Sequence, residues 1–178
     1  MSSKVVSVVG ATGNQGLGVV QNLLDDFQVR AFTRSPEKLN QLSHANLSVV
    51  HVDPNDTAAL TEALKGSWAL FVNTFSDWSK PLGVEEKLGK SIVDAAAEAG
   101  VEWLVYSGLP DNMPFRAFVE KANVVKYARE VAKKSGLKNI FVEVCFLLCA
   151  CLKVMVDNGD SLVGGILHVE FRVVPSYL

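Results

Sequence analysis

The chain has 178 residues, 49% of them hydrophobic, which suits one compact domain with its own core. Its 17 Lys and Arg residues nearly balance 19 Asp and Glu residues, and without a basic block we expect no direct contact with nucleic acid. The start lacks the apolar segment of a secretory signal, and the longest apolar run, 144–152, is far shorter than the roughly 20 residues of a membrane helix. We expect a soluble protein of the cytoplasm or the nucleus with no membrane contact.

The most informative segment comes early, where an apolar run at residues 5–9 leads into Gly-Ala-Thr-Gly-Asn-Gln-Gly at 10–16. Three glycines at three-residue spacing after a buried strand are typical of a βα turn that binds the pyrophosphate of a dinucleotide. The helix expected from about residue 14 presents free N–H groups and its positive dipole end to the phosphates. The alternative is a glycine-rich turn without a ligand. The residues expected to contact the cofactor here are Gly10, Thr12, Gly13, Asn14, Gln15 and Gly16.

Arg34 follows the second expected strand, 27–33. In a dinucleotide-binding fold, the residue just beyond this strand meets the adenosine ribose. A carboxylate there would hold the 2′-hydroxyl of NAD, whereas a guanidinium suits the 2′-phosphate of NADP. The sequence therefore predicts NADP(H) in preference to NAD(H), the alternative being an ordinary solvated arginine.

Polar residues follow the third and fourth expected strands. Asp53 is a candidate acceptor for the adenine amino group or a helix cap, and for Asp56 we favour capping. Asn73 and Thr74 lie in a loop expected near the ribose and nicotinamide, where both could donate hydrogen bonds to a cofactor or shape the turn.

A helix expected at 115–134 carries a cation in an unusual place. On its helical wheel Lys121 falls within the apolar stripe, whereas Glu120 falls on the opposite, polar face. An inward lysine needs a partner because burying an unpaired ammonium is costly, and a ribose hydroxyl or a phosphate would provide one. Alternatively, the side chain extends to solvent at the helix end.

The three cysteines, at 145, 149 and 151, all lie in the apolar run near the end of the chain. Buried thiols behave as small hydrophobic groups, and no histidine stands at a familiar ligand spacing. We therefore favour core packing over metal ligation or redox chemistry, and predict no metal site.

The whole pattern predicts an α/β fold with a doubly wound, mostly parallel sheet, because short apolar strands alternate with helical segments. We assign residues 1–156 to a dinucleotide-binding Rossmann domain and 157–178 to a C-terminal extension. That extension contains an alternating run at 166–174 that suits a strand or a hairpin. The expected strands are 4–9, 27–33, 47–52, 68–73, 102–107 and 138–144.

From residue 4 to about 146 the chain resembles the NmrA-like family, atypical members of the short-chain dehydrogenase/reductase superfamily. The motifs that carry this resemblance are the glycine turn, Thr33-Arg34-Ser35, Asp53 with Asp56, Val105-Tyr106-Ser107-Gly108 and Phe118-Val119-Glu120-Lys121. The resemblance implies a Rossmann domain that prefers NADP through Arg34 and retains the helical lysine as Lys121. It also implies that the chain carries little or no second substrate domain, residues 157–178 being a remnant of the family's smaller lobe.

The resemblance also bears on activity. An ordinary short-chain dehydrogenase has a tyrosine proton donor four residues before this lysine, where this chain has Ala117. Some relatives sense cofactor redox state and bind protein partners, while others resemble quinone reductases and transfer hydride. We therefore expect an NADP(H)-binding regulatory or redox-sensor protein. The alternative is an NADPH-dependent oxidoreductase acting on a quinone or other carbonyl, with Lys121, Ser107 or water replacing the tyrosine. An exposed apolar surface, expected where the smaller lobe is lacking, would favour a protein partner or a homodimer.

Overall fold

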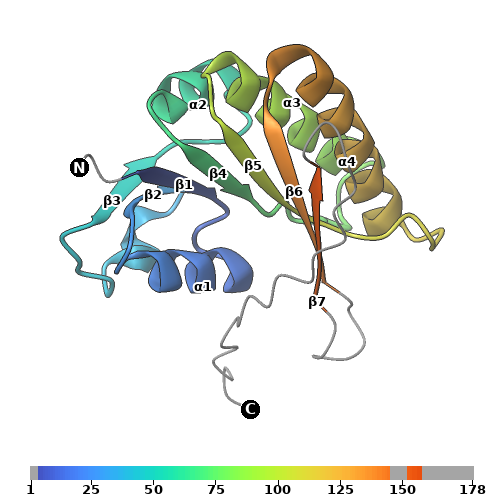
Figure 1. Cartoon of the computed structure of the whole chain (residues 1–178). Coiled ribbons are helices and arrows are strands. Elements are labelled where there is room, and N and C mark those ends of the chain that lie inside the picture. The colour runs from blue at the N-terminus through green and yellow to red at the C-terminus, as the bar shows by residue number, and fades with distance from the viewer. Residues whose placement is uncertain (1–3, 145–151, 158–178) are drawn as a thin grey trace.

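A computed structural model of the chain describes residues 4–144 and 152–157. Its strands form one sheet in the order β3-β2-β1-β4-β5-β6-β7 (Figure 1). The first six run parallel, and β7 runs antiparallel to β6. The strands are β1 (Val5–Val9), β2 (Gln28–Thr33), β3 (Leu47–His51), β4 (Ala69–Val72), β5 (Trp103–Gly108), β6 (Lys138–Val144) and β7 (Leu152–Asp157).

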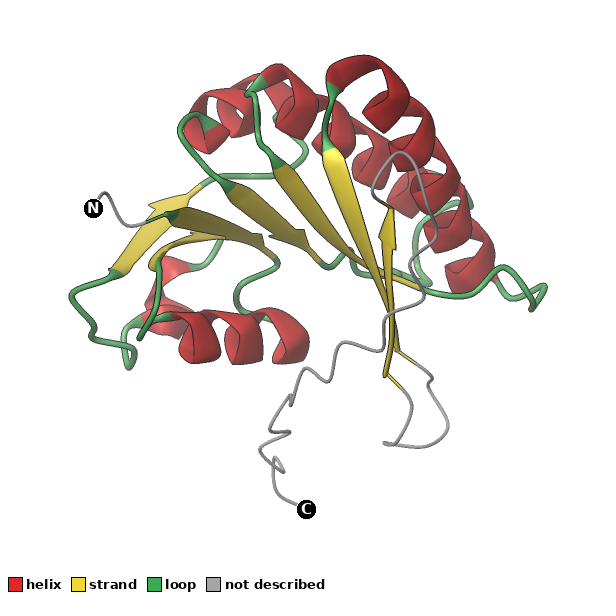
Figure 2. Ribbon diagram, in the orientation of Figure 1, coloured by secondary structure: helices red, strands yellow, loops and turns green. Residues whose placement is uncertain are grey.

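The helices lie in two layers around the sheet (Figures 1 and 2). One core lies between the sheet and α2, α3 and α4, and a second lies on the opposite face under α1. This arrangement confirms the expected α/β, doubly wound, mostly parallel sheet. The helices are α1 (Asn14–Leu23), the short 3-10 helix η1 (Pro36–Leu39), α2 (Thr57–Leu64), α3 (Val84–Glu98) and α4 (Arg116–Ser135).

Local sequence signals explain where several elements begin and end. Asp56 is the N-cap of α2, and its carboxylate accepts a hydrogen bond from the Ala59 amide at 3.0 Å, as the sequence predicts. After α2, Gly66 turns the chain at a φ of 76°, and Gly100 does the same after α3 at 74°. Strand β3 lies at the edge of the sheet and leaves Val49 38% exposed.

The α3 and α4 helices approach each other closely at Gly89. A Cβ atom at this position would lie 2.5 Å from Cγ2 of Val124. With valine at position 124 only glycine fits here, and this close crossing places the first half of α4 beside the first turns of α3. The polar cluster described below lies between these two segments.

The C-terminal part departs most from the sequence prediction, because β7 was not expected as a strand of this sheet. The cysteines at 145, 149 and 151 and most of the predicted extension 157–178 lie outside the described residues, so their roles and the domain boundary stay predictions. Within the described ranges, no helix is long and apolar enough to cross a membrane. The same ranges contain no cluster of three or more His, Cys, Asp or Glu side chains suited to a metal ion.

Candidate nucleotide site and its polar support

The β1–α1 turn is shaped by its three glycines. Gly10 has a φ of 82°, and a Cβ there would lie 2.8 Å from the carbonyl oxygen of Asn73. The amide of Gly13 donates to the Gly10 carbonyl at 3.0 Å and closes the turn. A Cβ on Gly16 would lie only 2.1 Å from that same carbonyl oxygen. The turn therefore requires glycine both for its backbone conformation and for its contact with α1.

The first turn of α1 has no side-chain cap. Its N-cap residue is Gly13, which has no side chain to accept from the helix amides, and the next helical residues are Asn14 and Gln15. The first amide groups of a helix have no acceptor within the helix, and they carry its partial positive charge. This end of α1 is therefore suited to a phosphate, and a Cβ on Gly13 would lie over the turn, 3.3 Å from the Gly10 oxygen.

Arg34 stands directly after β2 with its side chain exposed. Within the part of the chain that the structure describes, its guanidinium makes no hydrogen bond or close ion pair. Asp53 lies near enough for Arg34 to help lower the pKa of its carboxyl, although hydrogen bonds from the Asn55 amide and side chain contribute more. Because the Asp53 oxygen accepts both bonds, at 3.0 and 2.7 Å, this residue shapes a turn.

Lys121 points into the protein, as its position on the helical wheel predicts, and is 8% exposed. Its Nζ lies 2.8 Å from Oε1 of Glu85 and donates to the carbonyl and the hydroxyl of Thr74 at 2.7 and 3.0 Å. Burial lowers the pKa of Lys121, and the Glu85 carboxylate opposes that shift. These three acceptors match the three N–H donors of an ammonium group.

Thr74 connects this ion pair to β5. Its hydroxyl donates to Glu85 Oε1 at 2.7 Å, because a carboxylate can only accept. The Tyr106 hydroxyl, 3.0 Å away, must therefore be the donor in its bond to Thr74. Burial raises the pKa of Tyr106, so its phenol stays protonated. The side chain lies in the core that the sheet shares with α3 and α4.

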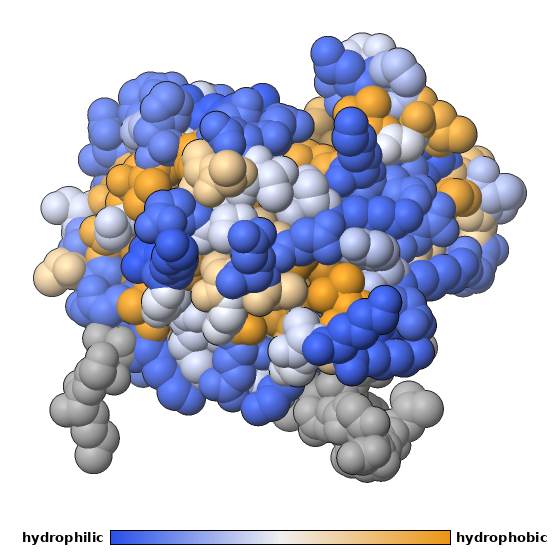
Figure 3. Space-filling model, turned by 90° about the horizontal axis from the view of Figure 1, so that it is seen from above, coloured by the Kyte–Doolittle hydropathy of each residue, from blue (hydrophilic) through white to orange (hydrophobic). Residues whose placement is uncertain are grey.

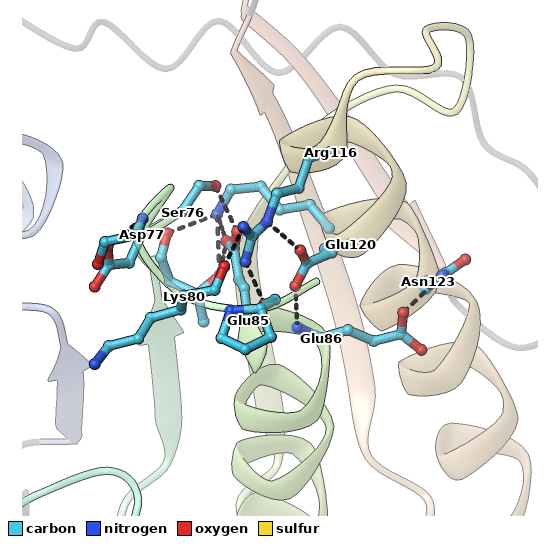
Figure 4. Close-up of polar contacts among 12 residues, drawn as sticks. Ser76, Asp77, Lys80, Glu85, Glu86, Arg116, Glu120 and Asn123 are labelled. Atoms are coloured by element: carbon cyan, nitrogen blue, oxygen red, sulfur yellow. Dashed lines mark hydrogen bonds and ion pairs between the residues drawn. The ribbon is translucent and has the colours of Figure 1, made fainter. Parts of the chain in front are cut away.

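The expectation that Glu120 lies on the polar outer face of its helix is wrong. The residue is buried and lies between α4 and the start of α3 (Figure 4). Its carboxylate is 1% exposed and accepts from the Glu86 amide at 3.1 Å and from Arg116 Nε at 2.7 Å. Burial alone would raise the pKa of Glu120, but bonds from the Glu86 and Gly83 amides and from Arg116 outweigh it and lower the pKa. Glu120 thus caps the start of α3, whose N-cap Gly83 has no side chain of its own.

Arg116 binds the loop that precedes α3 and holds it against Glu120 (Figure 4). Its two terminal nitrogens donate to the carbonyl oxygens of Lys80 and Pro81, each at 2.6 Å. Ser76, in the same loop, donates to the second oxygen of Glu85. No motif signalled these contacts in the sequence, although the i,i+4 spacing of Arg116 and Glu120 is an available clue.

Two further predicted residues lie near the glycine turn. Ser107, buried at the end of β5, donates to Oε1 of Gln15 at 2.7 Å and so joins β5 to the first turn of α1. Asn73 is half-buried beside Gly10, whereas Thr74 is turned inward. The glycine turn, Asn73 and Ser107 therefore lie together at the carboxyl ends of β1, β4 and β5, the carboxyl edge of the sheet. Lys121 lies on the inner side of Thr74.

Exposed apolar side chains lie in the two loops at the carboxyl edge of the sheet, 73–83 between β4 and α3 and 109–115 between β5 and α4. Phe75 is 80% exposed, and the others are Trp78, Leu82, Met113 and Phe115. Hydrophilic residues cover much of the face that carries α2, α3 and α4, with apolar patches between them (Figure 3). The hollows along that face, lined by residues such as Glu86 and Lys90, lie away from the glycine turn.

The sequence model of the NmrA-like family matches residues 2–155. The NmrA-like family domain-containing oxidoreductase FrzB of Cladobotryum sp is 40% identical over 151 residues, covering 76% of this chain and 45% of that protein. The oxidoreductase ptmS of Penicillium ochrochloron, of the same description, is 45% identical over 113 residues, covering 58% and 34%. The chain thus spans less than half the length of these relatives.

Solved structures show the same fold. An NADPH-dependent quinone oxidoreductase from Escherichia coli, in complex with NADPH, superposes with a TM-score of 0.65 and 28% identity, covering 76% of this chain and 47% of the other. NmrA, described as a negative transcriptional regulator and solved in complex with NADP, gives 0.64 and 26%, covering 79% and 45%. The same regulator has also been solved with NAD.

Proposed function

Because the chain belongs to the NmrA-like family, we propose that it binds NADP(H) at the β1–α1 turn and acts as a regulatory or redox-sensor protein. The observation that carries this proposal is the α1 N-terminus, whose Gly13 N-cap leaves the first amides without a side-chain partner. A pyrophosphate is the ligand chemistry that this end of a helix favours. The complexes of similar proteins with NADPH, NADP and NAD support the same ligand class.

In this proposal the cofactor lies along the carboxyl edge of the sheet. The turn residues Gly10, Thr12, Gly13, Asn14, Gln15 and Gly16 hold the pyrophosphate. Arg34 binds the 2′-phosphate, which its exposed guanidinium can reach without giving up another bond, and Asp53 lies on the adenine side. Asn73 and Lys121 serve the nicotinamide ribose, and Thr74 holds the lysine in place.

A sensing role is favoured over ordinary short-chain dehydrogenase chemistry by the positions of the possible proton donors. Position 117 is alanine. Tyr106 is buried and donates to Thr74, so it has no proton to give a substrate without breaking that bond. A protein partner or a second copy of the chain would then bind differently to the cofactor-bound and cofactor-free forms. The exposed Phe75 and Trp78 are suited to such a contact.

A second candidate is an NADPH-dependent reductase of a quinone or another carbonyl compound. Two curated relatives are described as oxidoreductases, and Ser107 lies at the end of β5 as a hydroxyl donor. The bound nicotinamide would supply hydride, and Ser107, Lys121 or water would supply the proton. Steady consumption of NADPH with a panel of quinones supports this candidate, and no consumption supports the sensor.

The deciding experiment is calorimetric titration of the full chain with NADPH, NADP, NADH and NAD. We expect binding of all four with the phosphorylated forms favoured, and Arg34→Ala to weaken NADPH about tenfold, as loss of a charged hydrogen bond would, with little effect on NADH. Lys65→Ala, a change at the exposed lysine that directly follows α2, is the matched control. Failure to bind any of the four nucleotides would refute the proposal, and equal affinities unaffected by Arg34→Ala would refute the preference for NADP(H).

A further inference from the structure

The ammonium group of Lys121 has no donor to spare in this structure. Its three N–H groups are matched by Glu85 Oε1, the Thr74 carbonyl and the Thr74 hydroxyl. If Lys121 serves a cofactor ribose, one of these protein acceptors has to be displaced.

Glu85 is the acceptor that is hardest to release. Its side chain is buried and receives bonds from Lys121, the Thr74 hydroxyl and the Ser76 hydroxyl. Moving the lysine away would leave this carboxylate buried without a counter-charge, which is strongly unfavourable. The Thr74 oxygens are neutral, and a ribose hydroxyl can replace a neutral acceptor at little net change in free energy.

Thr74 is also the acceptor that lies toward the glycine turn. It follows Asn73, whose carbonyl oxygen lies so close to Gly10 that a Cβ there would be 2.8 Å away. The Thr74 contact of Lys121 is therefore next in the chain to the residue that packs on the proposed cofactor turn, whereas Glu85 belongs to α3. We propose that Glu85 is the residue that orients the Lys121 ammonium, and that a bound nicotinamide ribose replaces Thr74 and not Glu85 as its partner.

The groups around Lys121 determine how its charge depends on pH. Glu85 faces it from α3, and the Tyr106 ring faces it from β5 at 5.7 Å. On its own helix, Glu120 and Arg116 are paired with each other. Burial lowers the pKa of Lys121 and Glu85 raises it, so a variant without the Glu85 charge is expected to lose the Lys121 proton at lower pH.

This inference rests on the proposed NADP(H) binding, and its test uses the full chain. The NADPH dissociation constant is measured at pH 6.5 and pH 9 for the unchanged protein, Glu85→Gln and Glu86→Gln. Glu86 is the matched control because it is the next residue of α3 but pairs with Lys90 and Asn123. We expect Glu85→Gln to weaken NADPH about tenfold more at pH 9 than at pH 6.5, since the charged hydrogen bond is then lost, and Glu86→Gln to behave as the unchanged protein.

Each result has a distinct meaning. A folded Glu85→Gln variant with the affinity and pH profile of Glu86→Gln overturns the inference while NADPH binding stands. If Glu85→Gln does not fold, the double variant Glu85→Leu/Lys121→Met replaces the ion pair by apolar groups of similar size. It should bind NADPH weakly and equally at both pH values, and binding as tight as in the unchanged protein overturns the inference. Failure of the unchanged protein to bind NADPH refutes the proposed function, and the inference with it.

Discussion

The starts of α1 and α3 lie at the same edge of the sheet and differ in how their amides are satisfied. Both helices have a glycine N-cap, Gly13 and Gly83, so neither N-cap residue offers a side-chain acceptor. At α3 the protein supplies an anion from another helix, the carboxylate of Glu120. At α1 no side chain caps the first turn.

The positive end of a helix can therefore serve either folding or ligand binding. Glu120 is held at α3 by Arg116, which also fastens the loop at Lys80 and Pro81, so this helix start acts as a structural joint. An equivalent carboxylate at α1 would compete with a phosphate for the same amides. We infer that the missing cap at α1 is part of the proposed binding function.

The largest expected effect comes from Gly16→Ala, which disturbs the uncapped start of α1. The new Cβ would lie 2.1 Å from the Gly10 carbonyl oxygen, so the turn has to move. We expect NADPH binding to be lost and stability to fall by about 3 kcal/mol, as in other overpacked sites. Calorimetry and urea unfolding measure the two effects. The control is Gly18→Ala in the same helix, where a Cβ meets nothing within 4 Å and stability should rise.

The next largest effect comes from Glu120→Gln, which removes the charge that caps the start of α3. The amide keeps the shape of the side chain but loses the charge that binds Arg116 and the first amides of α3. We expect a loss of about 2 kcal/mol in the free energy of unfolding, because hydrogen bonds to a charged group become neutral ones. Glu130→Gln, at an exposed carboxylate of the same helix, should cost much less. Equal losses for the two variants would contradict the capping role.

The pH dependence of stability tests the same Glu120 cap and is expected to show a smaller effect. The pKa of Glu120 is lowered in the folded state, so its contribution is complete above the pKa of the unfolded chain, about 4.3, and is lost as pH falls through the folded pKa. The difference in unfolding free energy between the unchanged protein and Glu120→Gln should therefore shrink below about pH 4.3. Urea unfolding at several pH values measures it. A difference that does not vary with pH would count against this account.

The smallest effect is expected at a third helix start, α2, which is capped by its own residue Asp56. Asp56→Ala removes the acceptor of the Ala59 amide and should cost about 1 kcal/mol of stability. Since α2 is not part of the proposed nucleotide site, the NADPH affinity should stay unchanged. Asp56→Asn, which retains an acceptor oxygen, should recover most of the stability, and a full loss with asparagine would argue against capping.

The sequence predicts what depends on local pattern. The glycine turn, the six parallel strands and the inward position of Lys121 follow from spacing and periodicity, and the structure agrees with them. The partners of Lys121 and the burial of Glu120 could not be predicted in this way. A helical wheel assumes that polar side chains face water, whereas Glu120 is buried because the start of α3 and Arg116 together satisfy its charge. The nucleotide contacts themselves stay predictions.

The crossing of α3 and α4 has a consequence for how this chain can vary. Gly89 and Val124 come from different helices and occupy one shared space, since a Cβ on the glycine would overlap a methyl group of the valine. A methyl group added at position 89 can be accommodated if the side chain at position 124 is shortened, as in a Gly89→Ala, Val124→Ala pair, which adds one methyl group and removes two. The two positions are therefore expected to change together in any redesign of this protein, because a larger side chain at position 89 requires a smaller one at position 124.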